Sequence, residues 1–487
     1  MLKNLRSRTA LYPLLLMVAQ AMPSIGSASL PARLILLVDG VSYCDVKALQ
    51  EGTSSKATRG RTTQAFQFGY FPVSRLISTF PSVSDPAWNE ILGNPPAPGY
   101  QRTYFSEATG SGASENGVTS SAEYEKQMTW QLRGNLRRLA SYGSPVRAFR
   151  YELSEVIKNF LQSDGQEANF YALIHSTDSA QHLWGDINSM LCVLDESLQE
   201  LRAIYRAREG KELEILILSD HGNNHAGSGK RIGIRHFLAK HGYRIRNSLT
   251  RPKDVVLPTA GIESWVEIHN SPSETINLVQ LLSHLDGVDL VTARLPNEKN
   301  RFIVMSSKGE RAVIEWNSQD DSFKYESETG DPLRYRPVVE ALASRHVLDS
   351  KGFATADSWM AATLTHHYPL ALERIVRGHT KVTLNPASIL ISLDNAHVHS
   401  GWLIMRGIAL VRSGGTHGAL DDISSTGVLL SSFAPTQDTS TSRVAALFDG
   451  FKGRRDDRLG ENSAEWLSGK SRRPEASGRR PKDIVQN

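Results

Sequence analysis

The chain has little cysteine, no strong excess of charge and a single long apolar stretch, and each shortage excludes a class of protein. Only two cysteines, Cys44 and Cys192, occur among 487 residues. A fold of this size does not depend on a disulfide framework, and without a Cys-x-x-Cys spacing the thiols do not indicate a metal site. We expect two separate buried thiols, although an oxidising compartment would allow a bridge between them.

The formal net charge of +4 does not indicate a surface for nucleic acid. Three positive charges lie in the first eight residues, and the segment 450–487 holds ten Lys or Arg against six Asp or Glu. The rest of the chain therefore carries about −3, which argues against specific DNA or RNA binding. Because the segment 450–487 is too polar to bury a core, we predict a disordered basic tail there.

The long apolar stretch lies at the N-terminus. Residues 1–29 combine a basic start, an apolar segment from Ala10 to Ala21 and a small-residue end, Gly26-Ser-Ala-Ser29. This pattern is typical of a secretory signal peptide. A membrane anchor is the weaker interpretation, since the segment contains a proline and is short for a span. We predict an exported protein, periplasmic or secreted, with no membrane span in its mature chain.

What the chain does have is a series of short apolar runs that lead into polar residues. The runs and their polar residues are 33–38 with Asp39, 169–174 with Asp178 and His182, and 213–218 with Asp220 and His221. Runs rich in Ile and Leu are typical of buried parallel strands, and ligands gather at the carboxyl ends of such strands. Asp178 and His182 are four residues apart, so they share one face of a helix.

The alternation of strand and helix patterns predicts an α/β fold with a doubly wound, mostly parallel sheet flanked by helices. Amphipathic helices are expected over 145–163 and 187–206. Beyond Pro252 the pieces become shorter, and the runs 301–305 and 312–316 predict a hairpin, so we expect a smaller α+β insertion. The predicted division is a signal peptide over 1–29, a catalytic core over 30–251 and 381–449, an inserted α+β or cap region over 252–380, and the tail 450–487.

Two further segments add polar groups. The segment Thr79-Phe-Pro-Ser82-Val-Ser84-Asp85-Pro86 predicts a hydroxyl-rich turn that leads into a helix. A hydroxyl at a helix start lies where backbone N–H groups and the helix dipole favour an anion. The later segment Gly414-Gly-Thr-His417-Gly418 supplies an imidazole. Any one of these residues alone would be explained as a cap or a satisfied polar group, but carboxylates and imidazoles from several segments suit Zn²⁺, with Mn²⁺ as an alternative.

In their order along the chain, these motifs resemble those of the alkaline phosphatase superfamily, and most of all its type I phosphodiesterase/nucleotide pyrophosphatase branch. The matching segments cover about 33–222 and 387–430. The resemblance implies two divalent metal ions, a small-molecule phosphate ester as substrate, and cleavage of phosphodiester or pyrophosphate bonds through a seryl-phosphate intermediate. It assigns Asp178, His182 and His417 to one ion, Asp39, Asp220 and His221 to the other, and the nucleophile to Ser84.

Thr79 is the main alternative to Ser84 as nucleophile, and Ser78 and Ser82 lie close by. The chain also departs from the family pattern. Many relatives carry Thr-Phe-Pro-Asn-His at the nucleophile and a later Asn that grips a phosphate oxygen. The neighbourhood here offers Asn94, Arg102 and Tyr104 instead, and His225 is a further candidate beside the site, so a nucleotide specificity is in doubt.

Other functions follow from the same motifs. The sequence Ser84-x-Pro86-x-Trp88 resembles a sulfatase motif without its Arg, which disfavours a sulfatase. A phosphomonoesterase or phosphonate hydrolase would share the metal ligands, whereas a non-catalytic metal-binding scaffold is disfavoured because every expected ligand position is filled. His397 and His399 alternate as on one face of a strand, and we interpret them as ordinary surface residues rather than substrate contacts.

Overall fold

The computed structural model describes residues 29–54, 64–114, 122–133, 142–165, 167–184, 187–225, 229–258, 261–400 and 414–447. The predicted basic tail and all but the last residue of the predicted signal peptide lie outside these ranges, so both stay predictions. Within the described ranges, no helix is long and apolar enough to cross a membrane.

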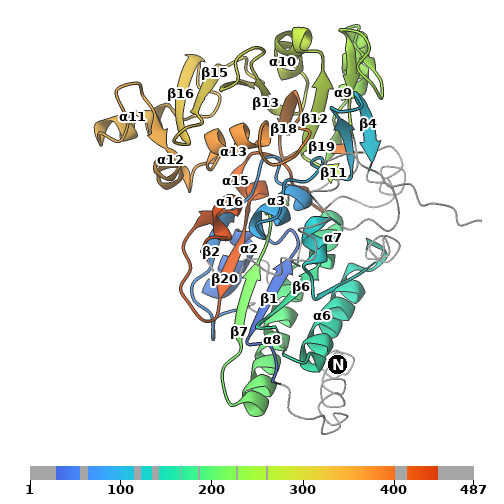
Figure 1. The fold of residues 1–487 in the computed structure, drawn as a ribbon, viewed down its shortest axis with the longest axis vertical. Helices are drawn as coiled ribbons and strands as arrows, with labels where there is room; N and C mark the ends of the chain where they lie inside the picture. Colours follow the sequence, from blue (N-terminus) through green and yellow to red (C-terminus); the bar gives the residue numbers. More distant parts are fainter. Residues whose placement is uncertain are drawn as a thin grey trace, which may run out of the picture. The chain divides into compact units, whose positions relative to one another are not determined.

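A seven-stranded sheet contains the apolar runs that the sequence singles out (Figure 1). In sheet order its strands are β21 (Thr439–Ser440), β2 (Ser74–Ile77), β20 (Thr426–Ser431), β7 (Glu214–Leu218), β1 (Arg33–Val38), β6 (Asn169–Ile174) and β5 (Trp130–Gln131). Only β20 runs antiparallel to its neighbours. Strand β1 pairs in parallel with both β7 and β6, so the carboxyl ends of these three strands meet at one edge of the sheet.

Helices cover both faces of this sheet, which confirms the predicted doubly wound α/β fold. Leu34 and Leu36 of β1 pack with α2 (Tyr43–Glu51), α6 (Pro145–Gln162) and α8 (Asn188–Glu209). Ile35 and Leu37 pack on the opposite face with α3 (Ser84–Ile91), α4 (Glu123–Lys126) and α16 (Thr441–Val444). Successive side chains of a strand point to opposite faces of the sheet, so the apolar residues of β1 contribute to the hydrophobic cores on both faces.

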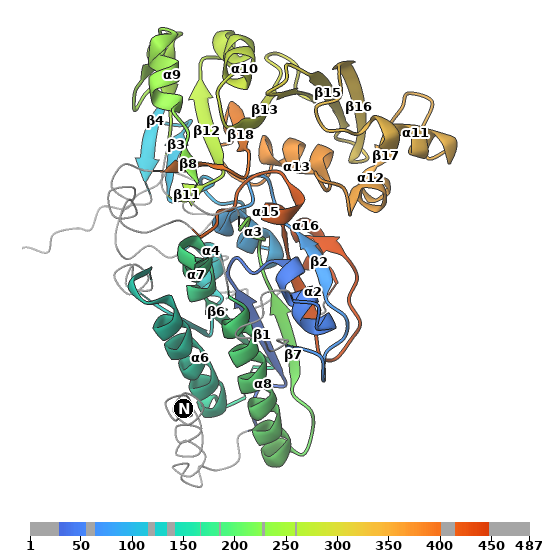
Figure 2. The same cartoon turned by 180° about the vertical axis from the view of Figure 1, so that it is seen from behind.

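The helices α6 and α8 lie side by side in both views (Figures 1 and 2). Helix α6 buries Phe149, Leu153, Val156 and Phe160, whose spacing of three or four residues places them on one face. Helix α8 ends at Gly210, which has a φ of 69° and a backbone N–H bonded to a carbonyl of the last turn. The ranges predicted for both helices are confirmed to within three residues at each end.

A second sheet has nine strands and is mostly antiparallel. In sheet order they are β17 (Ala354–Thr355), β16 (Ser322–Thr329), β15 (Arg311–Asn317), β14 (Arg301–Ser306), β13 (Val288–Arg294), β18 (Ile389–Leu393), β12 (Trp265–Asn270), β10 (Asp254–Val256) and β9 (Arg244–Ile245). The predicted hairpin is the pair β14 and β15. Strands β9 and β18 lie outside the predicted insertion 252–380, and the domain boundaries themselves stay a prediction.

The remaining elements lie around the two sheets. They are α7 (Ser176–Trp184), α9 (Ile234–Lys240), η2 (Pro272–Glu274), α10 (Thr275–Ser283), α11 (Arg336–Ser344), α12 (Ala356–Thr363), α13 (Ala371–Gly378), α15 (Asp422–Ser425), the pair β3 (Thr103–Ser106) and β4 (Ser111–Ser114), and the small sheet of β11 (Ile262–Glu263), β19 (His397–Ser400) and β8 (Lys230–Arg231).

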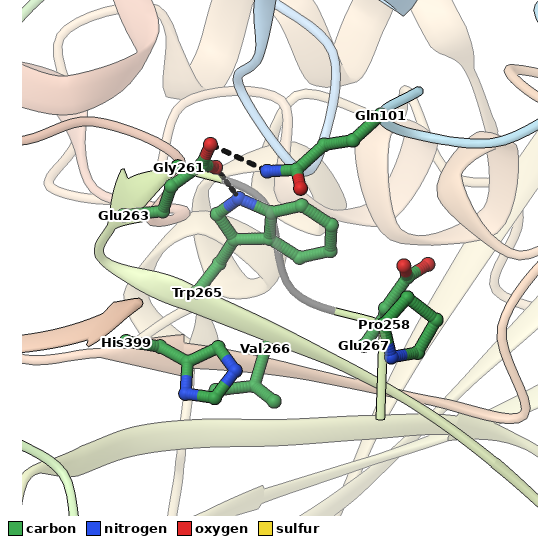
Figure 3. A pocket seen from close by; sticks show the side chains of 8 residues that line it. All are labelled: Gln101, Pro258, Gly261, Glu263, Trp265, Val266, Glu267 and His399. Atoms are coloured by element: carbon green, nitrogen blue, oxygen red, sulfur yellow. Dashed lines mark hydrogen bonds between the residues drawn. The ribbon is translucent and has the colours of Figure 1, made fainter. Parts of the chain in front are cut away.

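Strand β12 divides its side chains between two environments. Val266 and Ile268 pack into an apolar cluster with α10. Trp265 and Glu267 point to the other side, where they line a small pocket together with Gln101 (Figure 3).

The two cysteines are not buried as predicted. Cys44 is exposed, Cys192 is half-buried, and both thiols are free. Helix α2 buries Tyr43, Val46 and Leu49, and Cys44 lies off that face. The apolar periodicity of the helix therefore decides the exposure of this thiol.

The buried side chain of Arg374 joins α13 to two loops. Its guanidinium donates to the carbonyl oxygens of Leu420 at 2.8 Å and Thr79 at 3.0 Å, and to the hydroxyl of Ser425 at 2.5 Å. Burial lowers the pKa of Arg374 to about 10, so the group stays charged at pH 7. It thereby holds together the loops that precede Ser84 and follow His417.

We expect Arg374→Met to lower the free energy of unfolding by about 3 kcal/mol, because it leaves several buried acceptors without a donor. Urea denaturation measures the change. Arg345→Met is the control, since Arg345 is exposed at the end of α11, and its effect should stay within about 0.5 kcal/mol. Equal effects of the two substitutions would contradict the role of Arg374.

Candidate metal centre

Three neighbouring strands end on polar side chains at one edge of the seven-stranded sheet. Asp39 directly follows β1, His175 directly follows β6, and Asp220 and His221 follow β7 after one serine. Because the strands are parallel and adjacent, their ends bring these groups together. Helix α7 begins directly after His175, and its first two turns add Asp178 and His182.

Two more segments complete the cluster. Ser84 is the first residue of α3, and its hydroxyl donates to Asp39 Oδ1 at 3.1 Å and lies 3.4 Å from His221 Nε2. The ring of His417 stacks on that of His221 with a centroid separation of 3.8 Å. The structure thus brings together Ser84 and all six residues predicted to bind metal.

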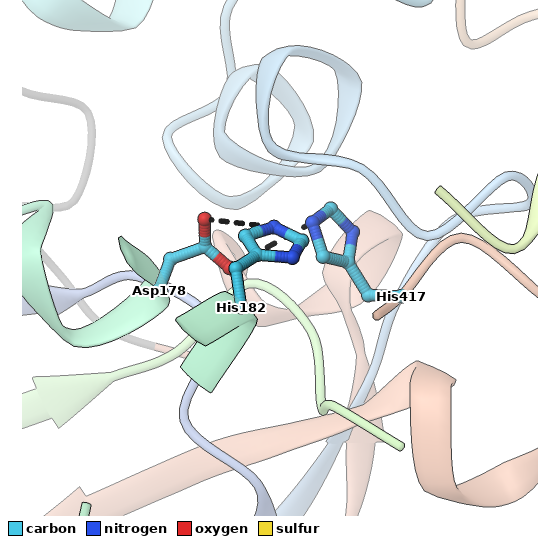
Figure 4. Close-up of side chains that lie close together, drawn as sticks. All are labelled: Asp178, His182 and His417. Atoms are coloured by element: carbon cyan, nitrogen blue, oxygen red, sulfur yellow. Dashed lines mark ion pairs between the residues drawn. The ribbon is translucent and has the colours of Figure 1, made fainter. Parts of the chain in front are cut away.

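The carboxylate and imidazole atoms form two overlapping groups. In the first, Asp178 lies 3.3 Å from His182 Nε2 and 3.7 Å from His417 Nε2 (Figure 4). The second consists of Asp39, Asp178 and His221, so Asp178 belongs to both. Asp220 Oδ2 lies 3.3 Å from His221 Nε2. Atoms that bind one tetrahedral zinc ion at about 2.1 Å are roughly 3.4 Å apart, so these separations suit shared cations.

The three imidazole rings are held in the orientation that a metal ligand needs. The Nδ1 atoms of His182, His221 and His417 lie 3.1, 2.8 and 2.9 Å from the backbone carbonyls of Gly415, Gly222 and Ser82. A carbonyl only accepts, so each Nδ1 carries the proton and donates it. In the neutral form of each ring, Nε2 then has a lone pair that can bind a cation.

The buried carboxylates are not satisfied by hydrogen bonds alone. Among the described residues, Asp178 Oδ1 and Asp220 Oδ2 have no hydrogen-bond partner. Burial, and then the charge of Asp39, raises the pKa of Asp220 well above its ordinary value. Burial also opposes ionisation of Asp178, but His182 and the other nearby imidazoles outweigh it and lower the pKa of Asp178. These atoms fit a site for divalent cations, which would neutralise the charge that the cluster concentrates.

The same electrostatics act on the imidazoles. Burial lowers the pKa of His417 well below its ordinary value, and the neighbouring His221 adds to this effect. Burial also acts against protonation of His182, but Asp178 outweighs it and raises the pKa of His182 to about 9. A cation bound at His182 Nε2 would therefore replace a proton that Asp178 favours.

Gly40 allows the close packing of the cluster. Its φ is +70°, and a Cβ atom at this position would lie 2.8 Å from Asp178 Oδ1. Its backbone N–H donates to Asp220 Oδ1 at 3.1 Å. The turn after β1 therefore positions carboxylates from two other segments, and it has no room for a side chain.

His175 is a residue whose role the sequence analysis missed. Its Nδ1 lies 3.2 Å from Asp39 Oδ2, so it fixes that carboxylate while Oδ1 faces Ser84. The signal was available, because His175 directly follows β6 just as Asp39 directly follows β1.

The other candidate residues make contacts elsewhere. The hydroxyl of Thr79 donates to the carbonyl of Pro81 at 2.6 Å within its own turn. Asn94 accepts from Gln127, Arg102 pairs with Glu125 at 3.0 Å, His225 lies 3.0 Å from Asp45, and Tyr104 is half-buried on β3. Their predicted roles toward substrate stay predictions. His397 and His399 are buried, so their interpretation as surface residues is wrong.

No protein-family model matches the chain, and no curated protein sequence matches it. Solved structures similar to it include human ectonucleotide pyrophosphatase/phosphodiesterase 5, with 10% sequence identity and a TM-score of 0.44. The murine counterpart has 9% identity and a TM-score of 0.43. Each likeness covers 85% of this chain and 93% of the other. At this sequence identity and TM-score, no residue role can be transferred from those proteins to this one.

We expect Gly40→Ala to lower the free energy of unfolding by about 3 kcal/mol and the affinity for Zn²⁺ at least about tenfold, because the methyl group displaces Asp178. Denaturation and calorimetric titration with Zn²⁺ measure the two effects.

Gly210→Ala is the matched control for this substitution. Gly210 has a φ of +69° but no atom within 4 Å of its Cβ position, so it carries only the conformational cost of about 1 kcal/mol. Its Zn²⁺ affinity should equal that of the unchanged protein. Equal losses of stability in the two variants, with Zn²⁺ affinity intact in both, would contradict the close packing at Gly40.

Proposed function

We propose that the chain is an exported metal-dependent phosphohydrolase of the alkaline phosphatase superfamily, of its type I phosphodiesterase/nucleotide pyrophosphatase branch. It cleaves phosphodiester or pyrophosphate bonds in small-molecule substrates. The observation that carries the proposal is the position of the Ser84 hydroxyl at the start of α3, 3.1 Å from Asp39 and 3.4 Å from His221, beside the metal-ligand cluster.

Two divalent ions, zinc or else manganese, would be held by the residues of this cluster. Asp178, His182 and His417 would hold one ion, and Asp39, Asp220 and His221 the other. When bound, such ions neutralise charge on the phosphoryl oxygens and favour the ionised forms of the attacking and leaving hydroxyl groups. Asp178 belongs to both groups of ligand atoms, so its carboxylate would control the distance between the two ions.

The chain's own residues position the reacting groups. Asp39 Oδ1 accepts the hydrogen bond of Ser84 and orients its Oγ, while His175 fixes the other carboxylate oxygen. The N-terminus of α3 directs backbone N–H groups toward the region where a phosphate would bind. Ser84 Oγ loses its proton and attacks phosphorus, the bond to the leaving oxygen breaks and that oxygen takes up a proton, and the phosphoryl group, with its remaining ester group in the case of a diester, stays on the serine. Attack of water on this intermediate then releases phosphate or its monoester and restores the serine.

Metal analysis together with paired assays tests the proposal. We expect about two divalent ions per chain in the purified protein, and faster hydrolysis of a bis-aryl phosphate than of a mono-aryl phosphate. A chelator should abolish both activities, and Zn²⁺ should restore them. Fewer than two ions per chain with no hydrolysis of either ester would reject the enzyme. A strong preference for the monoester would favour a phosphomonoesterase, which uses the same ligands.

Substitution of the proposed nucleophile gives a separate prediction. Ser84→Ala should reduce kcat for the diester at least about a thousandfold, because no other hydroxyl of its turn contacts the cluster, while metal content is retained. Steady-state kinetics and elemental analysis measure the two properties. If Ser84→Ala retains activity and Thr79→Val loses it, the role belongs to Thr79.

A further inference from the structure

A small pocket is lined by residues of β11 and β12, among them Glu263, Trp265 and Glu267 (Figure 3). Ser264, which lies between these strands, donates its backbone N–H and its hydroxyl to the carbonyl of His417, each at 2.8 Å. Gly418 packs against the ring of Trp265, where a Cβ atom would lie 2.1 Å from the indole. The wall of the pocket and the His417 segment are therefore in direct contact.

Glu267 lines the pocket with an unpaired carboxylate. Its exposed fraction is 3%, and neither of its oxygen atoms has a hydrogen-bond partner among the described residues. His269 Nε2 lies 3.7 Å from Glu267 Oε2, which is beyond hydrogen-bond distance. A buried carboxylate without hydrogen bonds is costly, and such a group in a pocket indicates a donor that comes from outside the chain.

The pocket also contains a second carboxylate and an imidazole. Glu263 receives hydrogen bonds from two neutral donors, the side-chain amide of Gln101 and the indole of Trp265. Burial lowers the pKa of His399 to about 4, so this ring is neutral at pH 7, and its Nε2 has no partner within the described part of the chain. None of the residues that line the pocket is Lys or Arg, so its walls favour a positive charge.

The pocket is small. About 10 Å³ is open to the centre of a water-sized sphere, which is room for roughly one water molecule. A primary ammonium group has nearly the size of water and carries three N–H donors. A trimethylammonium group is larger and has no N–H to offer. Size and hydrogen bonding therefore select the same ligand group.

We propose that this pocket binds the primary ammonium group of the substrate, so that the preferred substrates are phosphodiesters of a short amino alcohol. The substrate assignment rests on the proposed function, whereas binding of an ammonium group by the pocket does not. The ammonium donates to Glu267 while the phosphate lies at the metal centre, and Glu263 adds a second negative charge to the lining of the pocket. A second phosphate group in this position would meet two carboxylates, which disfavours nucleotide pyrophosphates.

The test compares three p-nitrophenyl phosphodiesters whose second ester group is 2-aminoethyl, ethyl or 2-(trimethylammonio)ethyl. We expect the 2-aminoethyl ester to have at least about tenfold higher kcat/KM than the ethyl ester, and the trimethylammonio ester to have no such advantage. The ratio of the first two values should approach one in Glu267→Gln and Glu263→Gln. Glu340→Gln, which removes an exposed carboxylate from α11, should keep the ratio.

Two results would overturn the substrate assignment. One is an equal kcat/KM for the 2-aminoethyl and ethyl esters in the unchanged protein, and the other is a preference that survives in both glutamine variants. Assays with added ammonium chloride test whether the pocket binds a free cation. If it accelerates hydrolysis of the ethyl ester and the 2-aminoethyl ester has no advantage, the pocket holds a free cation rather than a part of the substrate.

A binding measurement separates this proposal from the proposed function. Ethylammonium chloride should raise the thermal unfolding midpoint of the unchanged protein relative to tetramethylammonium chloride, and this difference should vanish in Glu267→Gln. With no ester hydrolysed but this difference present, the pocket is confirmed and the hydrolase is rejected. With no difference and no ester preference, the pocket proposal is rejected.

The glutamine variant also reports its own folding. Burial raises the pKa of Glu267. At a pH above the ordinary pKa of a glutamate, this group therefore lowers the free energy of unfolding. Glu267→Gln removes that cost, and its unfolding midpoint at pH 7 without ligand should equal or exceed that of the unchanged protein. A lower midpoint together with an intact ester preference would assign Glu267 a structural role and overturn the proposal.

Discussion

Three carboxylates, those of Asp39, Asp178 and Asp220, converge in a buried space, and their mutual repulsion is the constraint on which the rest of the site depends. Water cannot screen these charges well, so the surrounding structure must hold them together by other means. The Gly40 N–H binds Asp220, His175 binds Asp39, and His182 lies against Asp178. Each carboxylate thus has one fixed neighbour and one side that faces the cluster.

The arrangement is held by segments that are far apart in the chain. The two sheets meet where Ser264 binds the carbonyl of His417, and Arg374 binds the loops on either side of the cluster. The nine-stranded sheet therefore helps to set the positions of atoms at the edge of the seven-stranded sheet. The pocket beside Trp265 shares this support with the cluster, because it is built from β12, the strand that follows Ser264.

The parts of the fold that the sequence could predict are those with local signals. An apolar run that leads to Asp39 or to Asp220 predicts both a buried strand and a polar group at the end of that strand. Parallel pairing then places the ends of such strands at one edge of the sheet. The α/β class, the helices α6 and α8 and the hairpin of β14 and β15 followed from periodicity in the same way. That the six proposed ligands lie together followed from the order of the motifs, because each of these residues belongs to a short recognisable segment.

The parts that escaped prediction depend on contacts between distant residues. Strand β18 joins the nine-stranded sheet through β12 and β13, and nothing in its own sequence distinguishes the two sheets. The burial of His399 depends on its pairing with β11, and the shared position of Asp178 depends on the turn at Gly40. The local sequence predicts that Glu267 occupies the polar, exposed face of a half-buried strand. Only the fold shows that both faces of that strand are covered.

The single reversed strand, β20, has a consequence for how the molecule is assembled. Because β20 runs against its neighbours, the chain enters it at the edge where the parallel strands finish, so His417 can precede its strand and still reach the cluster. The strand also lies between β2 and β7, in the interior of the sheet. During synthesis β7 must therefore wait with an open edge until residue 431 has been made. His417 and the strand that joins β2 to β7 therefore arrive together, so the cluster and the interior of the sheet are completed by the same segment.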